Sequence, residues 1–308
     1  MQKQKTVIIT GGSGFIGSHL ADALIEQGHK VVVIDKVKPE KNRHNDHVKY
    51  IKINIQDEDV KDIFKKYKPD VVFHLAAHLH DRESVEKPVV NAMDNVIGLI
   101  NVCEGVRESG QAKIIFTSSC AVYGPQDVLP IDEQVNPVPL TPYGISKLTG
   151  EKYLHFYNKT YNIPYVAFRP GNIYGPRQDS SAESGVVGIF SSRLLKGKTA
   201  IINNDGKTTR DYVYVADVVT ALIKASELDY VGILNLGTGI QTTTMEIFDY
   251  VKDAVGTRAS HDWNEAQMDA TKYMELSIKK IKKELDWEPN TSLNEGIKKT
   301  VAWYRENI

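Results

Sequence analysis

The chain of 308 residues is predicted to be an α/β protein, with a doubly wound parallel sheet of the Rossmann type and a smaller C-terminal α/β domain. Apolar strand-like segments alternate with amphipathic helix-like segments up to about residue 170, which indicates a parallel sheet covered by helices on both faces. The first strand runs directly into a glycine-rich loop and a helix, as dinucleotide-binding folds do. From Pro170 onward, segments rich in Gly, Ser and Asn favour a second, smaller domain.

The opening strand, Thr6–Thr10, ends at three glycines that are spaced three residues apart. Gly11 lets the chain turn sharply, Gly14 lets backbone N–H groups approach a pyrophosphate, and Gly17 lets the helix lie close to the strand. The N-terminus of that helix offers unpaired N–H donors and the positive end of its dipole. The sequence therefore predicts a dinucleotide site here.

A second apolar segment, Lys30–Ile34, leads to Asp35, 18 residues after Gly17. A spacing of about 20 residues is typical of an acid that binds the ribose of a dinucleotide. Its carboxylate accepts hydrogen bonds from both ribose hydroxyls and repels a 2′-phosphate, so the cofactor is predicted to be NAD rather than NADP. Lys36 and Lys38 oppose this preference, because nearby cations could tolerate the additional phosphate.

Further strands and helices follow in alternation. We expect strands at 48–53, 71–75, 113–117 and 165–169, and helices at 57–66, 88–109, 142–161 and about 293–306. In such sheets, ligands bind outside the carboxyl ends of the strands.

The composition limits the partners and the compartment. Hydrophobic residues make up 41% and charged residues 25%, as in ordinary soluble proteins. A formal net charge of −1 gives no sign of nucleic acid or an anionic membrane as partner. Two cysteines, Cys103 and Cys120, build no disulfide framework, and neither a secretory segment nor an apolar run of about 18 residues is evident. We therefore expect a cytoplasmic protein.

Only one of the 15 tyrosines has a lysine four residues later: Tyr143, followed by Lys147. Thr141 suits a helix N-cap and Pro142 the first helical position, which places both side chains on one face. A free tyrosine has a pKa of about 10, and both a neighbouring ammonium and a positive nicotinamide ring would lower it. Tyr143 is thus a candidate base, although such a pair alone is more often a plain surface pair.

The strand at 113–117 leads into Ser118 and Ser119. A hydroxyl at this strand end would face the same crevice and could hold a substrate oxygen beside Tyr143. The alternative is an ordinary turn, in which serines are common.

Taken together, these motifs resemble the extended short-chain dehydrogenases/reductases that act on nucleotide sugars, most closely the UDP-hexose 4-epimerases. The resemblance covers nearly the whole chain. It rests on the glycine loop, residues 73–77, 95–98, 118–124, Tyr143 with Lys147, and residues 172–177, 209–212 and 235–239.

The resemblance implies that Tyr143 removes the proton of the sugar 4-hydroxyl while C4 gives its hydride to NAD. Ser119 would bind the same oxygen, and Lys147 would hold the nicotinamide ribose. The transient 4-keto sugar would then turn over and take the hydride back on its other face. Implied cofactor contacts are Gly11, Gly14, Phe15, Ile16, Gly17, Asp35, Asn54, Ile55, Leu75, Ala76, Ala77, Asn95, Tyr143 and Lys147. Implied substrate contacts are Ser118, Ser119, Asn172 and, for the diphosphate, Arg210.

The resemblance also implies two ligand-binding domains and a homodimer. Residues 1–170, with a return at about 211–240, would bind NAD, and residues 171–210 and 241–308 the nucleotide sugar. The helices at 88–109 and 142–161 would pair across a two-fold axis into a homodimer. No metal is expected, so His74, His78, His80 and Asp81 are not interpreted as a metal site.

Other activities of the family are less compatible with this sequence. Related 4,6-dehydratases carry Asp-Glu where this chain has Cys120 and Ala121, and related decarboxylases keep the Glu. Relatives that act on glucuronate place an arginine where Asp179 stands, so we expect a neutral hexose or its N-acetylamino form. Another nucleotide-sugar oxidoreductase, dehydratase or epimerase at a different carbon remains an alternative, as does an NAD-binding sensor without turnover.

Two departures leave the nucleotide open. The aromatic residue that stacks on uracil in relatives falls at Asn203. The second phosphate-binding arginine of the relatives is absent from residues 261–272.

Overall fold

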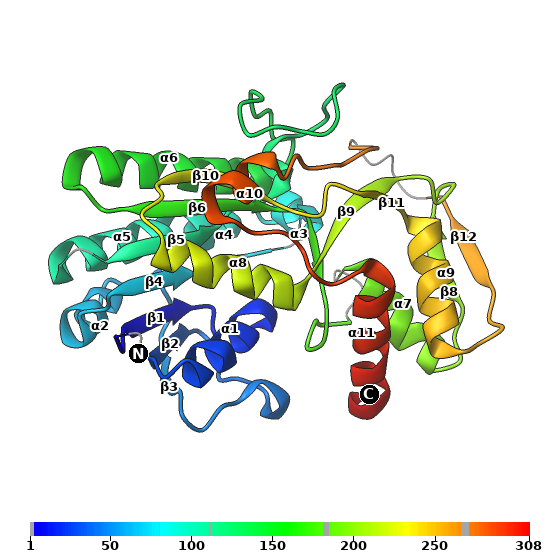
Figure 1. Cartoon of the computed structure of the whole chain (residues 1–308), viewed down its shortest axis with the longest axis horizontal. Helices are drawn as coiled ribbons and strands as arrows, with labels where there is room; N and C mark the ends of the chain where they lie inside the picture. Colours follow the sequence, from blue (N-terminus) through cyan, green and yellow to red (C-terminus); the bar gives the residue numbers. More distant parts are fainter. Residues whose placement is uncertain (1–2, 80, 111, 181–184, 266–270) are drawn as a thin grey trace. The chain divides into compact units, whose positions relative to one another are not determined.

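The structure is a computed structural model that describes residues 3–79, 81–110, 112–180, 185–265 and 271–308. Its largest sheet has seven strands. Its strand order is β10-β6-β5-β4-β1-β2-β3, and the labels follow this order from top to bottom in Figure 1. The neighbouring pairs from β3 to β6 run parallel. This confirms the predicted doubly wound fold. The strands are β1 (Thr6–Thr10), β2 (Lys30–Asp35), β3 (Lys49–Lys52), β4 (Val71–His74), β5 (Lys113–Thr117), β6 (Tyr165–Pro170) and β10 (Gly232–Leu236).

The strand order reverses between β1 and β4, which creates a topological switch point. The carboxyl ends of these two strands are joined there, since the backbone N–H of Leu75 donates to the carbonyl of Thr10 at 3.0 Å. Ligands of doubly wound sheets bind in the crevice outside such a point. The glycine-rich loop follows β1 directly and therefore begins at this crevice.

Helices cover both faces of the sheet. The main ones are α1 (Phe15–Glu26), α2 (Val60–Tyr67), α5 (Gly98–Ser109), α6 (Pro142–Tyr161) and α8 (Val215–Glu227). Apolar residues of α2, α5 and α6 form one buried cluster with the strands, including Phe64, Leu99 and Leu154. Ile8 of β1 belongs to this cluster. Its neighbour Ile9 is equally buried but points to the opposite face, where α1 contacts β1 and β2.

The helix expected at 88–109 is present, with a wide turn in its middle. α4 (Pro88–Ala92) continues through a π-helical turn, η2 (Met93–Ile97), into α5. Such turns are frequent at functional sites, and η2 carries Asn95. Among the described helices, this segment alone is long and apolar enough to cross a membrane, but 56% of its most apolar window is buried inside the structure. That burial is typical of a core helix.

The chain divides into two compact units. The first comprises Met1–Val122, Pro139–Arg169 and Val219–Leu234, and the second Tyr123–Val138, Pro170–Val218 and Asn235–Ile308. The boundaries expected from the sequence differ in three places, because residues 123–138, 211–218 and 235–240 belong to the second unit.

The second unit contains two small sheets, ordered β11-β9-β7 and β12-β8. The predicted terminal helix is present as α11. The strands are β7 (Asn172–Tyr174), β8 (Ala200–Asn203), β9 (Thr209–Tyr214), β11 (Gln241–Thr243) and β12 (His261–Asn264), and the helices α7 (Val186–Leu195), α9 (Thr244–Val255), α10 (Lys279–Leu285) and α11 (Leu293–Asn307).

Asp211 of β9 joins three segments of the second unit. Its fully buried carboxylate accepts hydrogen bonds from the backbone N–H groups of Thr238, Gly239 and Leu276, at 2.7, 2.9 and 3.2 Å, and from the hydroxyl of Thr238. The amide of Asn would turn N–H donors toward these donors. We expect Asp211→Asn to lower the free energy of unfolding by about 2–3 kcal/mol, measured by urea unfolding.

An exposed carboxylate provides the control. Asp205, in the turn between β8 and β9, accepts one backbone hydrogen bond, from Lys207. Asp205→Asn should change the stability by less than about 0.5 kcal/mol. Equal stability of the two variants would contradict the structural role of Asp211.

Candidate active site

The glycine loop lies at the switch point of the first unit. Gly11 has φ +73°, a conformation that side chains disfavour. A Cβ at this position would lie 2.6 Å from the backbone nitrogen of Ala76. The loops after β1 and β4 therefore approach each other at a distance that only glycine permits. α1 begins at Phe15 with Gly14 as its N-cap, and the first N–H groups of a helix have no partner within it. Phe15, Ile16 and Gly17 supply them here.

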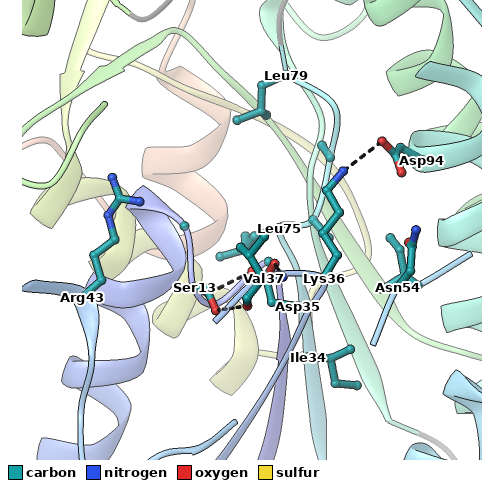
Figure 2. Close-up of a pocket in the computed structure, with 15 residues that line it drawn as sticks. Ser13, Ile34, Asp35, Lys36, Val37, Arg43, Asn54, Leu75, Leu79 and Asp94 are labelled. Carbon is teal, nitrogen blue, oxygen red and sulfur yellow. Dashed lines mark hydrogen bonds and ion pairs between the residues drawn. The ribbon is translucent and has the colours of Figure 1, made fainter. Parts of the chain in front are cut away.

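A pocket of about 210 Å³ opens between these loops (Figure 2). Eight of the predicted cofactor residues line it, and they come from separate parts of the chain: Gly11, Gly14, Asp35, Asn54, Ile55, Leu75, Ala76 and Ala77. Lys36, which the sequence analysis considered only for its charge, also lines it, and sequence reasoning missed three further residues with polar or charged side chains: Ser13, Arg43 and Asp94. Arg43 comes from a short 3₁₀ helix, η1 (Lys41–Arg43), and no sequence pattern pointed to it.

Asp35 is held at the edge of the pocket by backbone donors. Its carboxylate accepts hydrogen bonds from the N–H groups of Ser13 at 3.0 Å and Val37 at 3.1 Å. A carboxylate has about four acceptor positions, so two remain for ribose hydroxyls. Lys36 pairs with Asp94 at 3.3 Å, and Figure 2 shows its side chain extended toward that carboxylate. Asp94 offsets the lysine charge, which weakens the objection that Lys36 would favour NADP.

Asn95 connects the pocket to the first turns of α6. Its side-chain oxygen accepts from the N–H of His78 at 2.7 Å, and its amide donates to the hydroxyl of Ser146 at 2.9 Å. That hydroxyl donates to the carbonyl of Tyr143 at 2.8 Å. The π turn thus places Asn95 where it positions the backbone of Tyr143, and it does not line the pocket directly.

The predicted Tyr-Lys pair lies at the start of α6. Thr141 is the N-cap, as expected, and its hydroxyl accepts from the N–H of Gly144 at 3.1 Å. The ammonium of Lys147 lies 5.8 Å from the centroid of the Tyr143 ring and donates to the carbonyl of Thr117 at 2.7 Å. Tyr143 is 9% and Lys147 2% exposed. The two side chains therefore share one buried site beside the end of β5.

Burial determines the charge states around this pair. Desolvation lowers the pKa of Lys147 to about 7, although Glu151 acts in the opposite direction. Desolvation, with the charge of Lys147, lowers the pKa of His74 to about 3, so its imidazole is neutral. The Nδ1 atom of His74 lies 2.8 Å from the hydroxyl of Thr10.

The two serines after β5 point in different directions. The hydroxyl of Ser118 is buried and donates to Glu151 at 2.6 Å, which directs it into the core. The hydroxyl of Ser119 accepts from the N–H of Ala121 at 3.1 Å. A Cβ on Gly144 would lie 2.7 Å from the carbonyl oxygen of Ala121, so the serine loop packs tightly on the first turn of α6. The geometry favours Ser119 over Ser118 as the hydroxyl that accompanies Tyr143.

The predicted substrate residues of the second unit lie on paired strands. Asn172 of β7 is in register with Tyr212 of β9, two residues from Arg210. The guanidinium of Arg210 donates through one nitrogen to the carbonyls of Thr209 and Thr271, at 2.7 and 3.0 Å. One end of the guanidinium is thereby fixed by the backbone.

The position at which the family resemblance places a residue that stacks on uracil is polar. Asn203 is exposed and accepts from the amide of Asn264 at 2.9 Å. The neighbouring strand β12 carries an aromatic residue, Trp263, which is 57% exposed and in register with Ile202 of β8.

His78, in the loop after β4, lies near two carboxylates. His78 lies 3.2 Å from Glu83 and 3.6 Å from Asp94. Within the described residues, no three or more His, Cys, Asp or Glu side chains are placed to hold a metal. His80 lies outside the described residues.

The residues present fit NAD. A Cβ at Gly11 would clash with the loop after β4, so the glycine keeps room beside the helix N-terminus. Asp35 also retains acceptor positions for ribose hydroxyls at the edge of the pocket. The fold and the site define an NAD-binding enzyme of the short-chain dehydrogenase/reductase type. The chain belongs to the NAD dependent epimerase/dehydratase family, whose sequence pattern matches residues 7–237. It is thus an enzyme similar to UDP-glucose 4-epimerases.

The chain is 38% identical over 306 residues to the UDP-glucose 4-epimerase of Mycolicibacterium smegmatis, which covers 97% of this chain and 98% of the relative. Among solved structures, UDP-glucose 4-epimerase from Thermotoga maritima with UDP-glucose has a TM-score of 0.95 at 38% identity, covering 98% and 99% of the two chains. UDP-N-acetylglucosamine 4-epimerase from Methanobrevibacter ruminantium, in complex with UDP-N-acetylmuramic acid, has a TM-score of 0.95 at 32% identity and full coverage of both chains.

Proposed function

We propose that this enzyme is an NAD-dependent 4-epimerase of a neutral UDP-hexose, either UDP-glucose/UDP-galactose or the N-acetylhexosamine form. The observation that carries the proposal is the buried pair of Tyr143 and Lys147 beside the loop of Ser119. Relatives that epimerise UDP-glucose and UDP-N-acetylglucosamine match the chain over nearly its full length.

NAD, when bound, supplies the redox chemistry at C4 of the sugar. Tyr143 takes the proton of the 4-hydroxyl and later returns it, and Ser119 donates a hydrogen bond to the same oxygen. Lys147 stabilises the phenolate and binds the nicotinamide ribose. Because the proton and the hydrogen of C4 are both returned, the sequence of steps consumes no cofactor.

The serine loop argues against elimination. Cys120 and Ala121 lie in a short 3₁₀ helix, η3 (Cys120–Val122), and neither supplies a carboxylate that could remove a proton from C5 and protonate the C6 oxygen. A 4,6-dehydratase needs both functions. We therefore favour epimerisation over the dehydratase alternative.

A substrate panel tests the proposal. The purified protein would be incubated with UDP-glucose, UDP-galactose, their N-acetylamino forms, UDP-glucuronate, and dTDP- and GDP-sugars, without added reductant, and products identified by NMR. Interconversion of C4 epimers of a neutral UDP-sugar is expected. Release of NADH, a 4-keto-6-deoxy product, or NAD binding without turnover would each refute the proposal. Conversion of UDP-glucuronate alone would refute the neutral-hexose part, which rests on Asp179.

We also propose that the enzyme is a homodimer. Val89, Met93 and Ile97 are exposed apolar residues spaced four apart along α4 and η2, and Phe156 is exposed on the contacting helix α6. Side chains three or four residues apart share one helix face. This apolar stripe, with Phe156, is the expected contact with a second copy.

We expect Phe156→Glu to halve the molar mass measured by light scattering, because a buried, unpaired carboxylate would oppose pairing. Val231→Glu, which places the same charge on an exposed apolar residue in the loop before β10, should leave the mass unchanged. A monomeric mass of the parent protein would contradict the proposal.

A further inference from the structure

Glu151 and Arg169 form an ion pair in the core of the first unit. The Nε and Nη2 atoms of Arg169, on β6, donate to the two carboxylate oxygens at 2.9 and 2.7 Å. The two residues are 2% and 3% exposed. The hydroxyl of Ser118 donates to the same carboxylate at 2.6 Å. The carboxylate is therefore held by three donors in a single orientation.

The position of Glu151 along α6 relates this pair to the active site. Tyr143, Lys147 and Glu151 follow one another at intervals of four residues, so their side chains lie on one helix face. The rise of an α-helix places Glu151 about 6 Å along the axis from Lys147 and about 12 Å from Tyr143. Ser118, which binds Glu151, directly precedes Ser119.

The ammonium of Lys147 faces few groups that could stabilise its charge. On α6, Tyr143 lies one turn before it, and Glu151, whose charge raises its pKa, lies one turn after it. On β5, it lies 4.9 Å from the centroid of the Phe116 ring and donates to the carbonyl of Thr117. In the part of the chain that the structure describes, the other titratable neighbour is His74 of β4, which is neutral. Glu151 is the one anion among these groups.

We propose that Glu151 is a positioning residue for the reaction: its carboxylate, fixed by Arg169 and Ser118, keeps the buried ammonium of Lys147 charged so that Lys147 can stabilise the phenolate of Tyr143. The role of Glu151 in catalysis rests on the proposed function. Its effect on the charge of Lys147 and on the pKa of Tyr143 does not depend on that function.

Stability by itself is a weak reason for such a pair. Burying two charges costs desolvation energy that their attraction often fails to recover, and apolar residues of similar volume are frequently as stable. Lys147, however, is a third charge in the same core. Without Glu151, the cations of Lys147 and Arg169 would share this interior, and Lys147 would lose its proton more readily.

The test is a titration of Tyr143 in the protein saturated with NAD. Phenolate absorbance is followed against pH, and the difference between each protein and its Tyr143→Phe form isolates this tyrosine. We expect the midpoint in Glu151→Gln to lie about one pH unit higher than in the parent. Direct repulsion between Glu151 and the phenolate would lower the midpoint on removal of the carboxylate, so an unchanged or lower midpoint overturns the inference.

A second variant is needed in case Glu151→Gln fails to fold, because that substitution leaves Arg169 buried without its carboxylate. Glu151→Gln/Arg169→Met removes both charges and keeps the volume. Its midpoint should move in the same direction by a smaller amount, and an unchanged midpoint in a folded double variant overturns the inference.

Glu104 provides the matched control. On α5, its carboxylate accepts from the guanidinium of Arg107 and from the hydroxyl of Tyr157 at 2.7 Å. These are the same kinds of donor as around Glu151, in a pair that is partly exposed. Tyr157 lies 14 residues beyond Tyr143 on α6, about 21 Å along the axis. Glu104→Gln should leave the midpoint unchanged.

The pH dependence of turnover separates this inference from the proposed function. In Glu151→Gln, the acid limb of the kcat profile should move upward with the midpoint, while KM stays within about twofold, because Glu151 touches no substrate. If the parent epimerises no sugar, the proposed function fails, but the titration still decides the role of Glu151.

Discussion

Replacement of Tyr143 by Phe should leave NAD binding intact and lower turnover by at least about 10²-fold, the lower end for a general base. The substitution removes only the phenolic oxygen, and Phe preserves the ring that packs beside Lys147 in the buried site. NAD binding would be measured by calorimetry and turnover by NMR of the sugar products.

Removal of a hydroxyl elsewhere is the control for this experiment. Tyr250 is exposed on α9 of the second unit, and Tyr250→Phe should retain full activity. Near-normal turnover in Tyr143→Phe would show that another group moves the proton. Loss of NAD binding in that variant would show that the phenol holds the cofactor instead.

Lys147→Met should have two opposite effects. Turnover should fall by about 10²-fold or more, since the phenolate of Tyr143 loses its adjacent cation. The protein without NAD should nevertheless become more stable near pH 7, by about 2–4 kcal/mol. The stability gain arises because the ammonium is buried at a cost that its hydrogen bond to Thr117 offsets only partly.

The pH dependence of this difference follows from the two pKa values. Lys147 has a pKa of about 7 in the folded chain and 10.5 as its ordinary value. Between these values the unfolded chain binds more protons, so the parent gains stability as pH rises from 7 to 10.5. The advantage of Lys147→Met should therefore shrink over this window in urea unfolding curves. A difference that is constant with pH would mean that Lys147 is not the titrating group.

Much of the fold could be predicted because its signals are local. β1, β5 and α6 have the expected residues, since each combines an apolar pattern with a clear boundary such as the Thr141 cap. α2 begins at Val60 rather than at 57, because the N–H groups of Asp57 and Val60 bond backward in consecutive turns. The units were harder to delimit, since residues 123–138 join the second one through contacts distant in sequence.

The candidate site was predictable where a motif defines it and unpredictable where packing does. The glycine loop, Asp35, Tyr143 and Lys147 follow from residue type and spacing. The π turn that aims Asn95 at Ser146, and the approach of Arg43 to the pocket, depend on tertiary structure. Glu151 shows the limit most clearly: its spacing from Lys147 is visible in the sequence, but its pairing with Arg169 and Ser118 requires the register of β5, β6 and α6.

The interleaving of the two compact units has a practical consequence. The chain passes from one to the other after residues 122, 138, 169, 218 and 234, so neither unit is a continuous stretch that a single cut could release. A truncated fragment would lack strands or helices of its own core and should be degraded rather than fold. Exchange of sugar preference between relatives is therefore better attempted by grafting individual loops than by swapping halves of the polypeptide.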